Sequence, residues 1–234
     1  MNPDTITIFH TKLSRPRSLS KNKVMKKSIL LIILSLALIF TMVSCATGTI
    51  VYGQPQEADT VMIFYPGGKV DPAAYGDICT QLSDHGVPVI VAKMPFNLAI
   101  FNGNAATSIV KDYPNVDNWI LGGHSLGGVM ASSWAAKHPD SADLLVLLAS
   151  YPTKDISLPV LSLYGSEDGV LNREKYAQGM TRITNLEEHV IQGGNHCQFG
   201  DYGFQKGDNP AQISRDAQTE VTLNYILDFI DSNL

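Results

Sequence analysis

A five-residue segment with glycine at both ends, Gly123–Gly127, lies between an apolar run and a stretch of small residues. The run Trp119–Leu121 is typical of a buried strand, and Val129–Ala136 is typical of a helix. The pattern Gly-X-Ser-X-Gly at such a junction predicts a sharp turn that exposes the Ser125 hydroxyl at the edge of a sheet. Glycine is expected on both sides of the serine because the strand and the helix pass very close together. The segment therefore predicts a strand, a strained turn and a helix, in that order.

The partners of such a serine should follow in the order acid, then histidine, each after a strand. The apolar segment Leu158–Tyr164 predicts a strand, and the turn after it carries Asp168, our choice of orienting carboxylate. Glu167 is the alternative acid, and a solvated turn is the non-functional interpretation of both. After a further predicted strand around Glu188–Ile191, His196 lies in a glycine-flanked loop. We expect His196 to act as the general base of Ser125.

Four other histidines after the N-terminal segment have simpler explanations. His85 and His138 lie near predicted helix C-termini, where the helix dipole favours a cation. His189 belongs to a predicted strand. His124 precedes the serine, and we expect it to pack or to form hydrogen bonds rather than to react.

Backbone amides that could stabilise an oxyanion are predicted at two places. The N–H of Leu126 follows the serine at the start of the helix. A second donor should come from the loop after an earlier strand. The apolar segment Val61–Tyr65 leads directly into Pro-Gly-Gly-Lys, so we expect the amide of Gly68 or of Lys69 to serve. A glycine pair is also a common turn, and its order in the chain is what favours the functional interpretation.

Apolar strand patterns alternate with helix patterns from residue 59 onward, which predicts an α/β fold. Continuous apolar strands indicate a mainly parallel, twisted sheet with helices on both faces. The predicted strands are 61–65, 88–93, 118–122, 143–149, 158–164 and about 188–191, and the predicted helices are 72–83, 104–111, 125–137, 171–180 and 211–229. The connection from Ala149 to Leu158 is too short for a large cap domain. A lid built from Ala99 to Ser108 stays open as an alternative.

The N-terminal segment has the plan of an export signal. Residues 1–24 are a basic, polar extension, and an upstream start-site artefact with Met25 as the true initiator is one interpretation of them. Residues 25–45 hold two lysines, an apolar run and a small-residue boundary, as in a signal peptide or lipoprotein leader. Cys45 is the predicted lipidation site, and an uncleaved membrane anchor is the alternative. We expect a tether at 46–58, a domain at 59–234, and an exported, membrane-anchored protein at the cell surface or periplasmic side.

Charge and cysteine content exclude several classes of function. Residues 1–44 hold seven Lys or Arg and one Asp, and the whole chain has a formal charge of −5, so the remainder carries −11. Nucleic-acid binding is not expected of such an acidic domain. No metal-ligand spacing and no phosphate-binding glycine loop is present, so we expect no metal and no cofactor. A disulfide between Cys79 and Cys197 stays open, and Cys197 is a weaker alternative nucleophile because it lacks the glycine-flanked turn.

Several motifs together resemble those of the α/β-hydrolase superfamily, and within it a compact, lidless bacterial group of the fold-5 type. These are Tyr65–Gly68, Met94–Ala99, Gly122–Gly128, Ala149–Pro152 and Gly194–Gly203, and the resemblance covers roughly residues 59 to 230. It implies the α/β-hydrolase fold, a serine nucleophile and hydrolase activity. Within the last motif, one interpretation is that Asn195 and Gln198 shape the pocket; the other, which we favour, is that Asp201 and Tyr202 only brace the loop.

The expected function is cleavage of small carboxylic ester-like substrates through an acyl-enzyme on Ser125. Thioesterases, peptidases and acyltransferases use the same three side chains, so these activities stay open. A hydrolase-fold protein that binds a ligand without useful turnover is the alternative from another class. It has no need of a strained serine turn, and we therefore favour the enzyme. No protein partner is expected.

Overall fold

The computed structural model describes residues 28–33 and 48–234. Clustering of contacts divides the chain into two units, Met1–Met42 and Val43–Leu234. In the first unit, residues 28–33 are helical. None of the helices in the described ranges is both long and apolar enough to cross a bilayer. Cys45 and most of the predicted leader lie outside the described residues.

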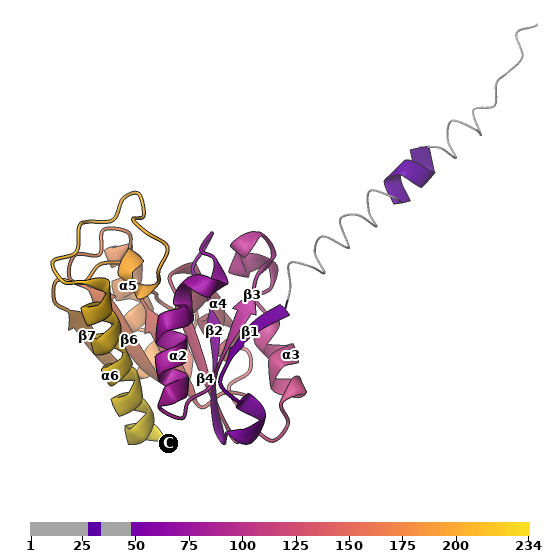
Figure 1. The fold of residues 1–234 in the computed structure, drawn as a ribbon, viewed down its shortest axis with the longest axis horizontal. Coiled ribbons are helices and arrows are strands. Elements are labelled where there is room, and N and C mark those ends of the chain that lie inside the picture. The colour runs from indigo at the N-terminus through magenta and orange to yellow at the C-terminus, as the bar shows by residue number, and fades with distance from the viewer. Residues whose placement is uncertain (1–27, 34–47) are drawn as a thin grey trace, which may run out of the picture. The chain divides into compact units, whose positions relative to one another are not determined.

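In the second unit, the residues described from 48 onward form one sheet of seven strands, in the order β1-β3-β2-β4-β5-β6-β7 (Figure 1). The six strands β3, β2, β4, β5, β6 and β7, in their order across the sheet, pair in parallel. Strand β1 pairs with β3 in the antiparallel sense. The strands are β1 (Gly48–Tyr52), β2 (Thr60–Tyr65), β3 (Val89–Lys93), β4 (Asn118–His124), β5 (Leu144–Leu148), β6 (Ile156–Gly165) and β7 (Ile183–Ile191). The sheet is the mainly parallel one that the apolar runs predict.

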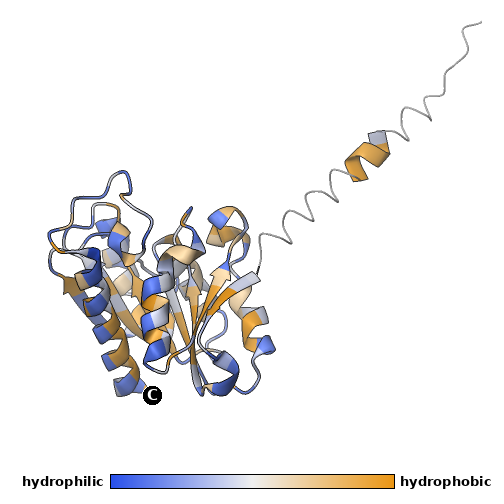
Figure 2. Ribbon diagram, viewed as in Figure 1, coloured by the Kyte–Doolittle hydropathy of each residue, from blue (hydrophilic) through white to orange (hydrophobic). Residues whose placement is uncertain are grey.

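Helices cover both faces of the sheet, as predicted. They are α2 (Gly76–Asp84), α3 (Ala105–Asp112), α4 (Leu126–Ala135), α5 (Arg173–Met180) and α6 (Arg215–Asn233). Successive residues of a strand point to opposite faces, so Met62 and Phe64 of β2 contribute to the core under α2 and α6. Val61 and Ile63 contribute to the core under α3 and α4. Figure 2 shows that the strands are mainly apolar, whereas α2 and α6 carry both polar and apolar residues.

Strand β1 was not predicted. Its residues fall in the segment expected to be a tether, but Gly48–Tyr52 pairs along its whole length with Val89–Lys93 of β3. Most of its side chains are exposed or half-buried, as is typical of an edge strand. Its short apolar run, Ile50–Tyr52, is a strand signal that the prediction of a tether overlooked.

Helix boundaries differ from prediction where a capping side chain decides them. Helix α5 begins at Arg173 rather than 171, because the Asn172 side chain accepts a hydrogen bond from the Lys175 amide at 2.9 Å. Helix α6 begins at Arg215 rather than 211, because Ser214 caps it by accepting from the Ala217 amide at 3.2 Å. Residues 149–155 join β5 directly to β6, so no cap domain is inserted there.

Candidate active site

Ser125 lies at a strained turn between β4 and α4. Its backbone has φ 52° and ψ −123°, a conformation that is costly for a residue with a side chain. Two hydrogen bonds hold the turn: the Ser125 amide donates to Leu148 O at 2.9 Å, and Ser150 Oγ donates to Ser125 O at 2.7 Å. The predicted strand–turn–helix is therefore present, and its strain falls on the serine itself.

The glycines around Ser125 are required by close backbone contact. A Cβ on Gly123 would lie 2.6 Å from the Gly128 amide nitrogen, and one on Gly127 would overlap the carbonyl oxygens of Tyr65 and Pro66. Because distances under 3.0 Å essentially never occur for real Cβ atoms, no other residue fits these positions without a shift of the backbone. The end of β2 therefore lies directly against the first turn of α4.

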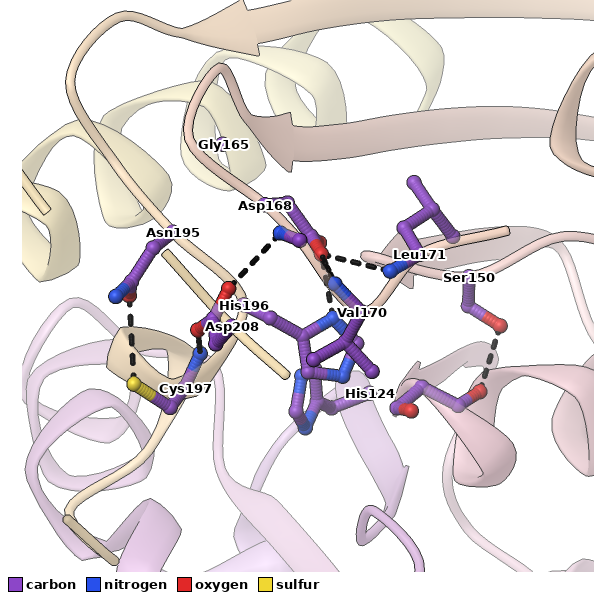
Figure 3. Close-up of polar contacts among 12 residues, drawn as sticks. His124, Ser150, Gly165, Asp168, Val170, Leu171, Asn195, His196, Cys197 and Asp208 are labelled. Atoms are coloured by element: carbon purple, nitrogen blue, oxygen red, sulfur yellow. Dashed lines mark hydrogen bonds and ion pairs between the residues drawn. The ribbon is translucent and has the colours of Figure 1, made fainter. Parts of the chain in front are cut away.

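Asp168 and His196 are joined at the ends of β6 and β7 (Figure 3). His196 Nδ1 lies 2.9 Å from Asp168 Oδ2, and both side chains are almost completely buried. Asp168 Oδ1 accepts from the amides of Val170 and Leu171 at 2.9 and 2.8 Å, which fixes the carboxylate. The two loops meet because Gly165 allows Gly194 to approach so closely that a Cβ would overlap the Gly194 carbonyl. The geometry thus selects Asp168 over Glu167, whose carboxylate accepts from the Ser166 hydroxyl instead.

One ring nitrogen of His196, Nε2, is left unpaired by the surrounding residues that the structure describes. Within the described ranges, His196 Nε2 is buried and has no hydrogen-bond partner. No hydrogen bond between Ser125 Oγ and this atom is formed there, and such contacts often tighten only when substrate is bound. Ser125 and His196 nevertheless line the same pocket.

That pocket has a volume of about 220 Å³. It is smaller than the 300–1,000 Å³ typical of sites for drug-sized ligands. Leu126, Val170 and Leu171 contribute apolar walls, while Ser150 and Asn172 contribute polar ones. The pocket therefore suits a small organic group beside Ser125 and His196.

Of the three amides predicted to bind an oxyanion, the geometry favours two. Leu126 begins α4, so its N–H is one of the amides that the helix leaves unpaired. Gly68 packs against the side chain of Leu126, since a Cβ on Gly68 would be 3.1 Å from Leu126 Cδ2. The Lys69 amide instead donates to Asn97 O at 2.7 Å. The Lys69 N–H is thus engaged with the 95–97 turn, which favours Gly68 over Lys69 as the second donor.

The histidine loop is braced by a second buried carboxylate, Asp208, which sequence reasoning missed. Asp208 Oδ1 accepts from the Gly169 amide at 3.0 Å, and Oδ2 accepts from the Cys197 amide at 2.8 Å. Asp208 thus joins the loop of Asp168 to the loop of His196. An aspartate in a Gly-Asp-Asn-Pro turn gives no signal of this role, because solvated turns contain the same residues.

Asn195 supports the same loop, although bracing was predicted for Asp201 and Tyr202 and not for Asn195. Its side chain donates to Asn209 O at 2.8 Å, and its backbone exchanges two hydrogen bonds with the Gln218 side chain. Gln198 also binds backbone, donating to Ile213 O at 3.0 Å. The Asp201 amide donates to Ala74 O at 2.7 Å.

His124 and Tyr75 form a buried pair beneath His196. His124 Nδ1 lies 2.8 Å from the Tyr75 hydroxyl, and this hydroxyl accepts from the Gly67 amide at 2.9 Å. The ring centroids of His124 and His196 are 4.6 Å apart. The bonding role expected of His124 is therefore present, whereas Tyr75 was not predicted and carries no sequence signal beyond its place in an amphipathic segment.

The remaining histidines have the simple roles expected of them. His85 Nδ1 contacts Gln81 O and His138 Nδ1 contacts Trp134 O, each near the C-terminal end of a helix. His189 pairs with Glu187 and stacks on Tyr225.

The cysteines do not rival Ser125. Cys79 and Cys197 are both buried free thiols. Burial is the main cause that raises the pKa of the Cys197 thiol, which disfavours the reactive thiolate. Among residues 28–33 and 48–234, no group of three or more His, Cys, Asp or Glu is arranged to hold a metal ion.

Comparison with solved structures gives many α/β hydrolases of the same fold. Est1E from Butyrivibrio proteoclasticus, with bound ferulic acid, has a TM-score of 0.60 at 15% identity, covering 79% of this chain and 96% of that one. The monoacylglycerol lipase of Paleococcus ferrophilus has a TM-score of 0.61 at 13% identity, covering 78% and 99%. The mouse alpha/beta hydrolase domain-containing protein 10 has a TM-score of 0.59 at 16% identity, covering 80% and 93%.

Sequence comparison gives one short match and one long one. A protein of Mycobacterium phage D29, named "Putative non-heme haloperoxidase", is 29% identical over 96 residues. That match spans 37% of this chain and about a third (34%) of the phage protein. The model of the alpha/beta hydrolase family matches residues 61–220, which include Ser125, Asp168 and His196. Because that match covers more than half of its length, the chain belongs to the alpha/beta hydrolase family.

Proposed function

We propose that this chain is a serine hydrolase that cleaves carboxylic esters through an acyl-enzyme on Ser125. The observation that carries the proposal is the strained Ser125 turn, which opens onto a pocket shared with His196. His196 is in turn hydrogen-bonded to Asp168. A strained serine beside a buried Asp–His pair is costly to maintain in a protein that only binds a ligand, so turnover is the better explanation.

In the proposed reaction, the Asp–His pair moves one proton. The Asp168 carboxylate accepts from Nδ1–H of His196, which leaves the lone pair on Nε2 to accept the proton of Ser125 Oγ. Oγ attacks the ester carbonyl carbon, and the carbonyl oxygen becomes an oxyanion. The amides of Leu126 and Gly68 are the proposed donors to that oxyanion. Because His196 is nearly enclosed, its bond to Asp168 is little weakened by water.

The intermediate then collapses and the enzyme is regenerated. The bond from carbon to the leaving oxygen breaks, and His196 gives its proton to that oxygen, so an alcohol departs and the acyl group stays on Oγ. A water molecule, deprotonated by His196, attacks the acyl-enzyme by the same route. The acid product leaves, and the proton returns to Oγ of Ser125.

Ester substrates are favoured by the solved structures of similar fold. Est1E has ferulic acid bound, and another similar structure is a monoacylglycerol lipase. Both names point to carboxylic acids and their esters, and the pocket of about 220 Å³ beside Ser125 has room for a small group. Thioesters and amides would use the same residues and are the alternative substrates.

The test is labelling and turnover with two serine variants of the full chain. Wild type should react with a fluorophosphonate and hydrolyse p-nitrophenyl acetate, and Ser125→Ala should lose both, with kcat lower by about 10⁴-fold or more. Ser133→Ala is the matched control, since Ser133 lies about two turns further along α4 and is only partly buried. Activity that survives in Ser125→Ala, or a folded wild type that neither labels nor turns over esters, thioesters or amides, would overturn the proposal.

A further inference from the structure

Three large apolar side chains are exposed together on the segment that precedes α3. Phe96, Ile100 and Phe101 are 74%, 54% and 58% exposed, and we call them the 96–101 cluster. They lie on two short 3₁₀ turns, Pro95–Asn97 and Ala99–Phe101, at the edge of the sheet where the parallel strands end (Figures 1 and 2). The rings of Phe96 and Phe101 contact each other edge to face, with centroids 5.8 Å apart. Single exposed apolar residues are ordinary, but a contiguous group marks a binding surface.

The backbone of the segment that carries this cluster is strained. Phe96 and Asn97 have φ values of 56° and 53°, in the left-handed region that a bulky residue such as phenylalanine rarely adopts. The strain is maintained by the hydrogen bond from the Lys69 amide to Asn97 O at 2.7 Å. The loop of the proposed oxyanion donor Gly68 therefore fixes the position of the cluster.

The cluster is continuous with the candidate active site through Leu98 and Leu126. The position that a Cβ on Gly68 would occupy lies 3.1 Å from Leu126 Cδ2 and 3.7 Å from Leu98 Cδ2. Leu126 also lines the pocket that holds Ser125 and His196. Leu126, Gly68 and Leu98 thus connect the pocket to the segment that carries the exposed cluster.

The proposed chemistry places the two parts of an ester, the alcohol arm and the acyl arm, on opposite sides of Ser125. The space on these two sides differs in size. His196 must reach the leaving oxygen to protonate it, so the alcohol arm belongs on the His196 side. That side is the pocket of about 220 Å³, which accepts only a small group. The acyl arm then points away from that pocket, past Gly68 toward Leu98.

We propose that the 96–101 cluster binds the acyl chain of the substrate, so that the preferred substrates are esters of a small alcohol with a long apolar acid. This inference rests on the proposed function and adds the substrate class. The occupant is an acyl chain because the surface is apolar, is joined to the oxyanion loop, and offers no charged side chain of its own.

The test compares acyl length with alcohol length. Wild type, Phe96→Asn/Phe101→Ser and Phe204→Ser are assayed as full chains with p-nitrophenyl esters of two to ten acyl carbons, below micelle formation. Asparagine is chosen at position 96 because it tolerates the left-handed backbone. Phe204 is the matched control, a 67% exposed phenylalanine on a different loop. A second series uses acetates of ethanol, butanol and octanol.

In wild type, kcat/KM should rise with acyl length. The double variant should lower the octanoate-to-acetate ratio of kcat/KM by about tenfold, as expected when about two methylene groups lose their apolar contact. The Phe204→Ser variant should keep the wild-type octanoate-to-acetate ratio, and the double variant should keep the wild-type ratio of octyl to ethyl acetate.

Other results overturn the inference in distinguishable ways. One result is that acetate turnover depends on Ser125 but the double variant has the same dependence on acyl length as wild type. This result would overturn the inference and leave the proposed function standing. The inference also fails if the double variant changes the dependence of kcat/KM on alcohol length instead of acyl length. It fails as well if the double variant changes only sedimentation with phosphatidylcholine vesicles, which would make the cluster a membrane contact. Absence of turnover with every ester would overturn both.

Discussion

His124, the residue immediately before the proposed nucleophile, is completely buried between Tyr75 and His196. The Gly67 amide donates to the Tyr75 oxygen, so the hydroxyl proton is free to bond with His124 Nδ1. Nε2 of His124 then carries the ring proton, and the imidazole is neutral. Burial first, and the neighbouring His196 second, lower the pKa of His124 well below its ordinary value, which the backbone of His196 only partly opposes. One neutral ring thereby supports His196 and, through Tyr75, the glycine loop of the oxyanion site.

The neutral state of His124 predicts a loss of stability in mild acid. In the unfolded chain this imidazole takes up a proton near pH 6.5, whereas in the folded protein it stays neutral. Below that pH the unfolded state therefore binds more protons, so the free energy of unfolding falls as the pH falls. Between pH 7 and pH 5 this one group should cost about 2 kcal/mol. Urea unfolding of wild type across this range is the measurement.

A substitution isolates the contribution of His124 from that of the other histidines. His124→Asn keeps a side-chain oxygen that can accept from Tyr75 but cannot be protonated in this range. The variant should be less stable at pH 7, and its difference from wild type should shrink as the pH approaches 5. Parallel stability curves for the two proteins would show that His124 does not titrate on unfolding.

At the residue scale, the order of the chain carries the information on which the three candidate site residues were predicted. Ser125, Asp168 and His196 each follow a strand in the order that the hydrolase pattern demands, and Asp168 and His196 are in hydrogen-bond contact. Tyr75 and Asp208 could not be predicted, because they act through contacts across 49 and 39 positions of the chain. A buried tyrosine in a helical pattern and an aspartate in a turn look the same whether or not they support a site.

At the element scale, the buried strands were predicted and the edge strand was not. β2, β4 and β5 are buried on both faces and read as continuous apolar runs. β1 alternates between exposed and half-buried residues, and its partner β3 lies some forty positions further along the chain. The pairing of β1 is therefore a contact between distant parts of the chain, which a local sequence pattern does not predict.

Strand β1 should be part of the folding unit rather than a dispensable tether. Ile50 and Tyr52 pack against the core, and removing them would expose the hydrogen-bonding edge of β3. A chain that begins at residue 54 should lose about 2 kcal/mol or more of stability relative to one that begins at residue 47, and should aggregate more readily. Urea midpoints and size-exclusion profiles of the two proteins provide the test. Equal midpoints would place Gly48–Tyr52 outside the cooperative unit.

At the scale of the whole molecule, charge is divided unevenly along the chain. Residues 1–44 carry a net positive charge, and the remainder, with its formal charge of −11, is strongly acidic. Anionic lipid surfaces repel an acidic domain, so that domain has no electrostatic means of staying at a membrane. We propose that the leader exports the chain and that a lipid on Cys45 retains it at the cell surface or periplasmic side. One acyl chain gives only marginal attachment, so retention requires more than one chain or an added anchor.

This proposal predicts membrane retention that depends on Cys45 and not on salt. Expressed in a bacterial host, the wild-type chain should sediment with membranes, stay there in 1 M salt (an ionic strength at which the Debye length is about 3 Å), and incorporate labelled palmitate. Cys45→Ser should incorporate none, whereas Cys79→Ser, the matched control at a buried thiol, should be labelled like wild type. Release of the wild-type chain by salt would indicate a charge-dependent attachment. Equal labelling of Cys45→Ser would place the lipid elsewhere, and retention of that variant without label would favour an uncleaved apolar anchor at residues 29–43.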